Sequence, residues 1–357
     1  MFLYKISANE AQQRFDKYLK KLLKEAPDSF IYKMLRKKNI VLNGKKSDGK
    51  EMLVVGDEVK LFLAADTFEK FSGLKVVSEA QHAKEAASVE QGMSQNELQQ
   101  YEKAYHDLQR DGMGASSVVY EDDNILVVNK PTGILSQKAS PNDISVNEWL
   151  IGYLLEKGDV TAQTLTTFKP SVCNRLDRNT SGMVVCGKTL AGSQYMNKII
   201  KDKTLQKFYH CLVPGTVQEL ERIQGYLYKD KKTNKVFIYQ NLEQVPKSQQ
   251  KDAAFIDTAF QTIQITKQVS LLEVQLFTGK THQIRAHLAS VGHPLIGDTK
   301  YGSEKVNRKY AKMGVTSQML HAYRLVFPKS EDERFTKLSG LTLICEEPDL
   351  FKRVLQE

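Results

Sequence analysis

The stretch from Asn174 to Gly182 carries one aspartate among arginines. Asp177 lies two residues after Arg175 and directly before Arg178. Positive charge beside a carboxylate favours its ionised form, which can act as a nucleophile or as a base. A polar turn with a surface ion pair has the same composition, and composition alone does not separate the two interpretations.

A second polar stretch, residues 278–288, follows a predicted strand. It contains Gly-Lys-Thr, but a phosphate-binding loop also needs a glycine at position 274, where this chain has Val274. His282 and His287 are five residues apart, whereas the two histidines of a metalloprotease helix are separated by four. We therefore expect neither a phosphate loop nor a metal site here, and the histidines can cap the helix or form hydrogen bonds within the fold.

A third stretch, residues 207–213, is a predicted strand. Lys207 and Tyr209 share one face of it with Cys211 and Val213. Tyr209 can pack in the core or stack on a nucleic-acid base. The chain has no glycine-rich dinucleotide loop, no Gly-x-Ser-x-Gly and no CxxC spacing, so the residues alone favour acid–base or nucleophilic chemistry at one aspartate.

The elements that must position these residues are mainly strands. Strands are expected at 118–120, 125–128, 183–186, 208–213, 236–239, 254–260, 269–277 and 341–345, and helices at 146–155, 191–200 and 282–291. Arg285 then lies near the start of the last helix. Because the strands outnumber the helices and do not alternate with them, we expect an α+β fold.

The charge is unevenly distributed over the 357 residues, with a net value of +9. Residues 1–64 contain 14 Lys and Arg against 8 Asp and Glu, residues 65–116 contain 5 against 9, and residues 117–357 contain 32 against 25. Such a surplus favours RNA, DNA or acidic lipid as a partner. No apolar run reaches the roughly 18 residues of a membrane span, no secretory signal is visible, and four scattered cysteines fit a reducing cytoplasm.

Three domains are expected from this distribution. The pattern of residues 1–64 predicts two helices followed by a hairpin at Asn43-Gly44, with the basic run Arg36-Lys37-Lys38 before the hairpin. Residues 65–116 are an acidic linker, partly helical or disordered. Residues 117–357 are the catalytic domain.

Four motifs in one order resemble the RluA-type pseudouridine synthases. Arg175–Gly182 is similar to their Arg-Leu-Asp-x-x-Thr-Ser-Gly motif, Asn129–Gly133 to their Asn-Lys-Pro-x-Gly turn and Lys207–Tyr209 to their Lys-x-Tyr strand. Gly279–Leu288, with Gly292–Asp298 and Tyr301-Gly302, is similar to their late motif. The likeness covers about residues 117–350. It departs from the family at Asn174, where His is usual, and at Lys280, where Arg is commoner.

The N-terminal 64 residues resemble an S4 RNA-binding domain at Arg14-Phe15-Asp16, Asn43-Gly44-Lys45 and Val55-Gly56-Asp57. Together the two likenesses imply a mixed, mainly antiparallel catalytic sheet with flanking helices and loops, and isomerisation of uridine to pseudouridine in large-subunit ribosomal RNA. The family reaction needs no metal or cofactor. A monomer is expected because the sequence suggests no exposed coiled-coil seam, and the cysteines and short apolar runs predict a cytoplasmic protein that does not act at a membrane. Two alternatives remain: a tRNA pseudouridine synthase, and a non-catalytic RNA-binding protein of ribosome assembly.

The resemblance also implies roles for residues. Asp177 would start the reaction by attack on the sugar, attack on the base or removal of a sugar proton. Arg285 would pair with Asp177, Tyr209 would stack on the target base and assist proton removal at C5, and Arg175 would fill the gap left by the flipped base. Further expected RNA contacts are Arg178, Thr180, Lys130, Lys207, His282, Gln283, Arg36, Lys37 and Lys38.

Overall fold

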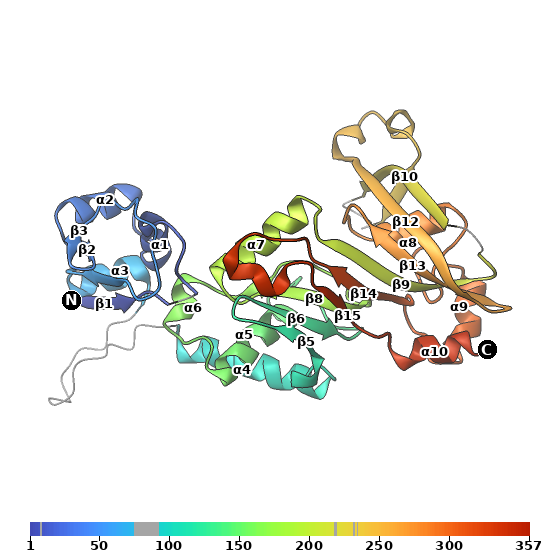
Figure 1. The fold of residues 1–357 in the computed structure, drawn as a ribbon, viewed down its shortest axis with the longest axis horizontal. Coiled ribbons are helices and arrows are strands. Elements are labelled where there is room, and N and C mark those ends of the chain that lie inside the picture. The colour runs from blue at the N-terminus through green and yellow to red at the C-terminus, as the bar shows by residue number, and fades with distance from the viewer. Residues whose placement is uncertain (8, 75–92, 218–219, 231–232, 234) are drawn as a thin grey trace.

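The computed structural model describes residues 1–7, 9–74, 93–217, 220–230, 233 and 235–357. A small N-terminal body lies beside a larger one that contains a long twisted sheet (Figure 1). Among the described residues, no helix is long and apolar enough to cross a membrane.

The N-terminal body is a four-stranded sheet covered by helices. Its strands follow the order β1-β4-β2-β3, with β1 at Phe2–Lys5, β2 at Ile40–Leu42, β3 at Lys45–Lys46 and β4 at Glu58–Leu61. The expected helices are α1 (Phe15–Leu22) and α2 (Asp28–Arg36). The expected hairpin is present, because Asn43 and Gly44 both have positive φ and Leu42 pairs with Lys45.

The predicted linker 65–116 is ordered at both ends. Helix α3 (Ala65–Ser72) packs on the N-terminal core, where Phe68 stacks on Phe2. Helix α4 (Gln95–Arg110) starts in a capping box and buries a narrow stripe that includes Tyr105 and Leu108 in the core of the larger body. The two helices of the segment thus pack on different bodies, and residues 75–92 lie outside the described residues.

The larger body is built on an eleven-stranded, mainly antiparallel sheet, as expected for the α+β class. Its main path is β11-β10-β12-β13-β9-β14-β8-β6-β5, β7 pairs with β8, β15 pairs with β14, and the pair of β8 with β14 is parallel. The strands are β5 (Val118–Glu121), β6 (Ile125–Lys130), β7 (Ser171–Val172), β8 (Ser181–Gly187), β9 (Gln206–Pro214), β10 (Leu220–Lys229), β11 (Val236–Tyr239), β12 (Ala254–Ile265), β13 (Val269–Leu276), β14 (Leu320–Val326) and β15 (Thr342–Ile344).

Helices cover both faces of the central strands. The helices are α5 (Val146–Lys157), α6 (Thr164–Thr167), α7 (Leu190–Lys201), α8 (Gln283–Ser290), α9 (Glu304–Ala311) and α10 (Asp349–Leu355). On one face Leu126 and Val184 pack with Trp149 of α5, and on the other Ile125 and Val185 pack with Met196 of α7. Burial on both faces explains why β6 and β8 are continuous apolar runs.

The two bodies contact each other through polar groups near α6. The Glu10 carboxylate accepts a hydrogen bond from the Thr167 hydroxyl, and both side chains are buried. The Asn9 amide donates to the Asp159 carbonyl oxygen at 3.4 Å. The segment that follows β1 in the N-terminal body therefore contacts α6 and the loop before it in the larger body.

A buried ionic cluster lies on β9, β13 and β14. His210 contacts the Glu347 carboxylate through Nδ1, lies 3.8 Å from Glu273 through Nε2 and stacks on Tyr323. Burial opposes protonation of His210, but the two glutamates outweigh it and raise its pKa above the usual value. His210 and Arg324 together lower the pKa of Glu273 to about 2.

Candidate active site

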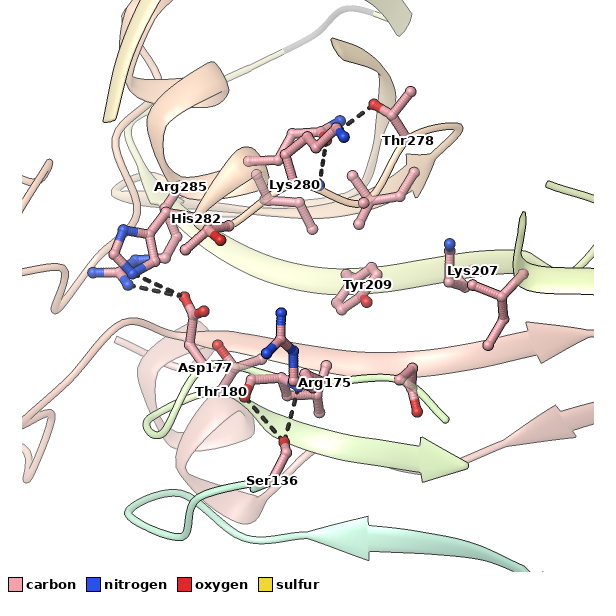
Figure 2. A pocket seen from close by; sticks show the side chains of 18 of the residues that line it. Ser136, Arg175, Asp177, Thr180, Lys207, Tyr209, Thr278, Lys280, His282 and Arg285 are labelled. Atoms are coloured by element: carbon pink, nitrogen blue, oxygen red, sulfur yellow. Dashed lines mark hydrogen bonds and ion pairs between the residues drawn. The ribbon is translucent and has the colours of Figure 1, made fainter. Parts of the chain in front are cut away.

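A cleft of about 1090 Å³ opens between the loops around residues 135–139 and 173–180 and the segment 276–285. Figure 2 shows Asp177 and Arg285 reaching toward each other across this cleft. One carboxylate, Asp177, lines it together with nine cationic side chains: Lys138, Arg175, Arg178, Lys201, Lys203, Lys207, Lys229, Lys280 and Arg285. Such a lining attracts a polyanion and disfavours cationic partners.

The Asp177 loop is fixed by groups distant in sequence. The Ser136 hydroxyl accepts from the Leu176 N–H at 3.0 Å and donates to the Leu176 carbonyl oxygen at 3.1 Å. The Lys130 ammonium donates to the carbonyl oxygen of Arg178 at 2.9 Å. Because the residues on both sides of Asp177 are held, its carboxylate has a defined position before substrate arrives.

The loop leads into β8 through a glycine that the packing requires. Gly182 has φ of +104° and pairs with Ala322 of β14. A Cβ there would lie 2.4 Å from the Ala322 carbonyl oxygen, so any larger residue would push the two strands apart. The final glycine of the motif thus sets the approach of β8 to β14.

Arg285 is shared by two carboxylates. Its Nη1 donates to Asp177 Oδ2 at 3.0 Å, while Nε and Nη2 donate to Asp298 at 2.7 and 2.9 Å. Asp298 also accepts from the N–H groups of Lys300 and Tyr301. Burial opposes ionisation of Asp298, but these donors outweigh it and hold its pKa below the usual value. Asp298 therefore orients the guanidinium, and the guanidinium orients Asp177.

His282 lies on the same side of Asp177. It precedes α8 with φ of +55°, its Nδ1 contacts the Tyr301 hydroxyl at 2.9 Å, and its Nε2 lies 3.8 Å from Asp177 Oδ2. Burial lowers the pKa of His282, with Asp177 opposing. Arg285 and His282 thus both approach Oδ2, and among the described residues no group donates to Oδ1, which faces the cleft.

Tyr209 lies on β9 in the wall of the cleft (Figure 2). Its side chain is nearly buried, and burial, with the nearby Asp177 charge, raises its pKa well above the usual value. Lys207 lies two residues away on the same face, and burial together with Lys203 lowers its pKa. Tyr209 is therefore a neutral ring beside the carboxylate, suited to a flat apolar contact.

The other expected RNA contacts divide into two groups. Arg175 and Arg178 are exposed side chains of the cleft lining. Thr180 and Gln283 also line the cleft but are buried, and the Gln283 amide is occupied by Asp257, Thr258, Thr278 and Lys280. The first group is accessible to a ligand, whereas the second holds the walls of the cleft.

Lys130 does not have the position expected of an RNA contact. It is 0 % exposed, and its ammonium donates to the carbonyl oxygens of Pro131, Ile134 and Arg178. Burial lowers its pKa to about 7, with Asp177 opposing. Its three donors are all used to hold backbone, so it supports the loop and has no group left for RNA.

Arg36, Lys37 and Lys38 lie in the N-terminal body, at the end of α2 and just after it, and all three side chains are exposed. They do not line the cleft around Asp177. Any contact they make with RNA is therefore separate from the contact at the cleft.

Three residues of the site had no role predicted from the sequence. Ser136, Asp298 and Tyr301 hold the Asp177 loop, Arg285 and His282. Asp298 and Tyr301 belong to the late motif, but only the fold shows what they contact. Within the described ranges, no group of three His, Cys, Asp or Glu side chains is arranged to hold a metal ion.

Comparison with known proteins gives one consistent result. The sequence profile of the RNA pseudouridylate synthase family matches residues 124–290. The ribosomal large subunit pseudouridine synthase C of Escherichia coli is 30 % identical over 90 % of this chain and 87 % of its own length. An uncharacterised RNA pseudouridine synthase of Mycoplasma genitalium is 35 % identical over 64 % of this chain and 68 % of its own.

A solved structure shows the same fold. The human RNA pseudouridylate synthase domain containing 4 superposes with a TM-score of 0.53 at 20 % identity, over 72 % of this chain and 96 % of that chain. The family profile matches the part of the chain that contains the cleft loops, and the identity to the Escherichia coli enzyme extends over 90 % of the chain. The chain therefore belongs to the RNA pseudouridine synthases of the RluA type.

Proposed function

We propose that this protein converts uridine to pseudouridine in large-subunit ribosomal RNA. The observation that carries the proposal is the Asp177–Arg285 pair in a cleft whose other charged side chains are all cationic. The substrate class is supported by the relative named ribosomal large subunit pseudouridine synthase C, which matches 90 % of the chain.

The reaction needs one carboxylate and no net transfer of atoms. The bond between C1′ of the ribose and N1 of uracil breaks, the base turns, and a bond forms between C1′ and C5. The proton lost from C5 is balanced by one gained at N1. Asp177 Oδ1 begins this sequence because Oδ2 is held by Arg285, and the ion pair keeps the carboxylate aimed at the flipped nucleoside.

Tyr209 and Arg175 have separate roles in this proposal. Since the pKa of Tyr209 is raised, its hydroxyl stays protonated at neutral pH, which supports stacking on the base and weighs against a tyrosinate that removes the C5 proton. Arg175 is exposed at the cleft and can occupy the space left by the flipped base. Extrusion costs a few kcal/mol, which the surrounding cations offset through phosphate contacts.

The N-terminal body is proposed to be an S4-like RNA-binding domain. Arg36, Lys37 and Lys38 form an exposed basic run at the end of α2, and Lys45 and Lys46 are exposed on β3. This domain would bind RNA outside the cleft and present the target uridine to it. The protein is proposed to act as a monomer in the cytoplasm, where ribosomes are assembled.

The decisive experiment maps pseudouridines in total RNA from cells with and without the protein, and from cells with Asp177→Asn in its place. We expect the deletion and Asp177→Asn to lose the same large-subunit positions, while the purified variant still binds RNA. Asp123→Asn is the matched control, because Asp123 is an exposed aspartate in the turn between β5 and β6. Lost positions in tRNA would establish the tRNA alternative, and unchanged maps would establish a non-catalytic protein.

A further inference from the structure

Five aromatic side chains share one face of the outer part of the sheet. In β10, Tyr226 pairs with Tyr239 of β11 and with Phe255 of β12, and Tyr228 pairs with Phe237 of β11. Paired residues point to the same side of a sheet, and so do alternate residues of one strand. We call this set, Tyr226, Tyr228, Phe237, Tyr239 and Phe255, the aromatic face.

The aromatic face does not belong to the core. The residues that alternate with it, Leu227, Val236 and Ile256, are buried on the opposite side of these strands against Ala286 of α8. Phe237 and Phe255 are each 45 % exposed. Packing of the fold therefore explains the apolar residues of the buried side but leaves the rings on the other side without a structural purpose.

The aromatic face meets the catalytic cleft at one edge, where β12 begins and β13 ends. The register places Tyr209 on the opposite side of the sheet, because it pairs with Val274, which pairs with Phe260. Phe255 belongs to both, and its ring contacts Tyr226 edge to face with centroids 5.9 Å apart. Arg222 lies on the same face, is 57 % exposed and covers the ring of Phe277, another residue of the cleft lining, at 4.4 Å. Its charge is paired with Asp257. Aromatic rings and a guanidinium plane thus extend from the edge of the cleft over the reverse side of the sheet.

We infer that the aromatic face binds unpaired bases of the substrate RNA next to the uridine held in the cleft. Bases stack on aromatic rings and on guanidinium planes, and exposed aromatics on a sheet take two or three bases in RNA recognition. Neighbouring strands are about 4.8 Å apart, so the face extends about 10 Å from β12 to β11. The inference rests on the proposed function and specifies its substrate as a uridine with single-stranded neighbours on one side.

The test compares ring chemistry at Phe237, which lies outside the cleft lining. Phe237→Leu keeps an apolar side chain without a ring, and Phe237→Tyr keeps the ring. The matched control is Ile263→Ala with Ile265→Ala, because both isoleucines are exposed and lie at the far end of β12. The probes are a fluorescent oligouridylate of 12 nucleotides and an RNA duplex of 12 base pairs, titrated with each full-length protein.

We expect Phe237→Leu to weaken oligouridylate binding about tenfold, while Phe237→Tyr and the isoleucine control bind as wild type does. Duplex binding should not change, because stacked pairs have no open face for the rings. Equal oligouridylate affinity of Phe237→Leu and wild type, or an equal loss in the control, overturns the inference. Failure of the proposed function is distinguishable, because it appears as unchanged pseudouridine maps and not as altered affinity.

Discussion

The two carboxylates that hold Arg285 differ in exposure, and their substitution should separate stability from activity. Asp298 is 0 % exposed and Asp177 is 27 % exposed. In Asp298→Asn the amide oxygen can still accept hydrogen bonds from the N–H groups of Lys300 and Tyr301. The amide nitrogen then faces Nε of Arg285, so two donors meet and that hydrogen bond is lost. Removing one partner of a buried pair costs about 3–5 kcal/mol. Because Asp177 still contacts Arg285, we expect a loss of about 3 kcal/mol in the free energy of unfolding.

Asp177→Asn should behave in the opposite way. Asp177 is partly exposed and has a single hydrogen bond to Arg285, so its loss should change stability by about 1 kcal/mol or less. Thermal melting then gives a Tm about 6–12 °C lower for Asp298→Asn and a near-normal Tm for Asp177→Asn. In a pseudouridine assay Asp177→Asn should form no product, and Asp298→Asn should be slowed because Arg285 has lost its orientation.

A paired substitution excludes a general packing effect. Arg285→Met alone leaves the Asp298 charge buried, whereas Arg285→Met with Asp298→Asn removes both charges and keeps an oxygen for the N–H groups of Lys300 and Tyr301. The double variant should regain most of the lost stability without regaining activity. The reasoning is refuted if Asp298→Asn has the same Tm as wild type or if the Tm of Asp177→Asn is as low as that of Asp298→Asn. It is also refuted if the double variant makes pseudouridine at the normal rate.

Three further predictions concern other parts of the chain. The pKa of His210 is raised, and that of Glu273 is lowered from 4.5 to about 2, so their contribution to stability is present between about pH 4.5 and 6.5. It falls as pH rises through the His210 value and as pH drops toward 2. The difference in free energy of unfolding between wild type and His210→Gln, measured in urea, should therefore shrink from about pH 6 to about pH 9, and a constant difference contradicts this. Gly182→Ala should cost about 3 kcal/mol of stability, read from thermal melting, because its Cβ meets the Ala322 backbone; an unchanged Tm contradicts the close approach. Replacing Arg36, Lys37 and Lys38 by Gln should weaken the salt dependence of RNA binding. The slope of log affinity against log salt concentration should fall by about one for each phosphate that these residues no longer neutralise. The same change at the exposed Lys305, Arg308 and Lys312 is the control and should leave the slope unchanged; equal slopes for the two triple variants would show that the N-terminal run does not contact phosphate.

Elements with strong local signals were predictable from the sequence. The strand Val236–Tyr239 has the expected bounds, and the hairpin at Asn43-Gly44 and helix α5 are present where expected. Strand β14 was not expected, because its mixed residues lack alternation and its place between β8 and β9 depends on pairing over more than 100 residues. Long-range pairing leaves little trace in local periodicity.

The site was predictable only in part for the same reason. Adjacent charge suggested Arg175 and Arg178 as the partners of Asp177, and the resemblance suggested Arg285, which is the contact found. The importance of Asp298 depends on its burial and on two backbone donors. Lys130 was expected to contact RNA, but its side chain is buried and its ammonium donates to three backbone carbonyl oxygens.

The sharing of Arg285 between Asp177 and Asp298 joins two loops more than 100 residues apart in the chain. These loops come together only when both halves of the long sheet are complete. On the mechanism proposed above, an incompletely folded chain keeps its lysines but lacks the Asp177–Arg285 pair that the reaction requires. We therefore expect pseudouridine formation to begin only once the tertiary structure is complete, so that newly made or damaged copies would leave uridines unmodified.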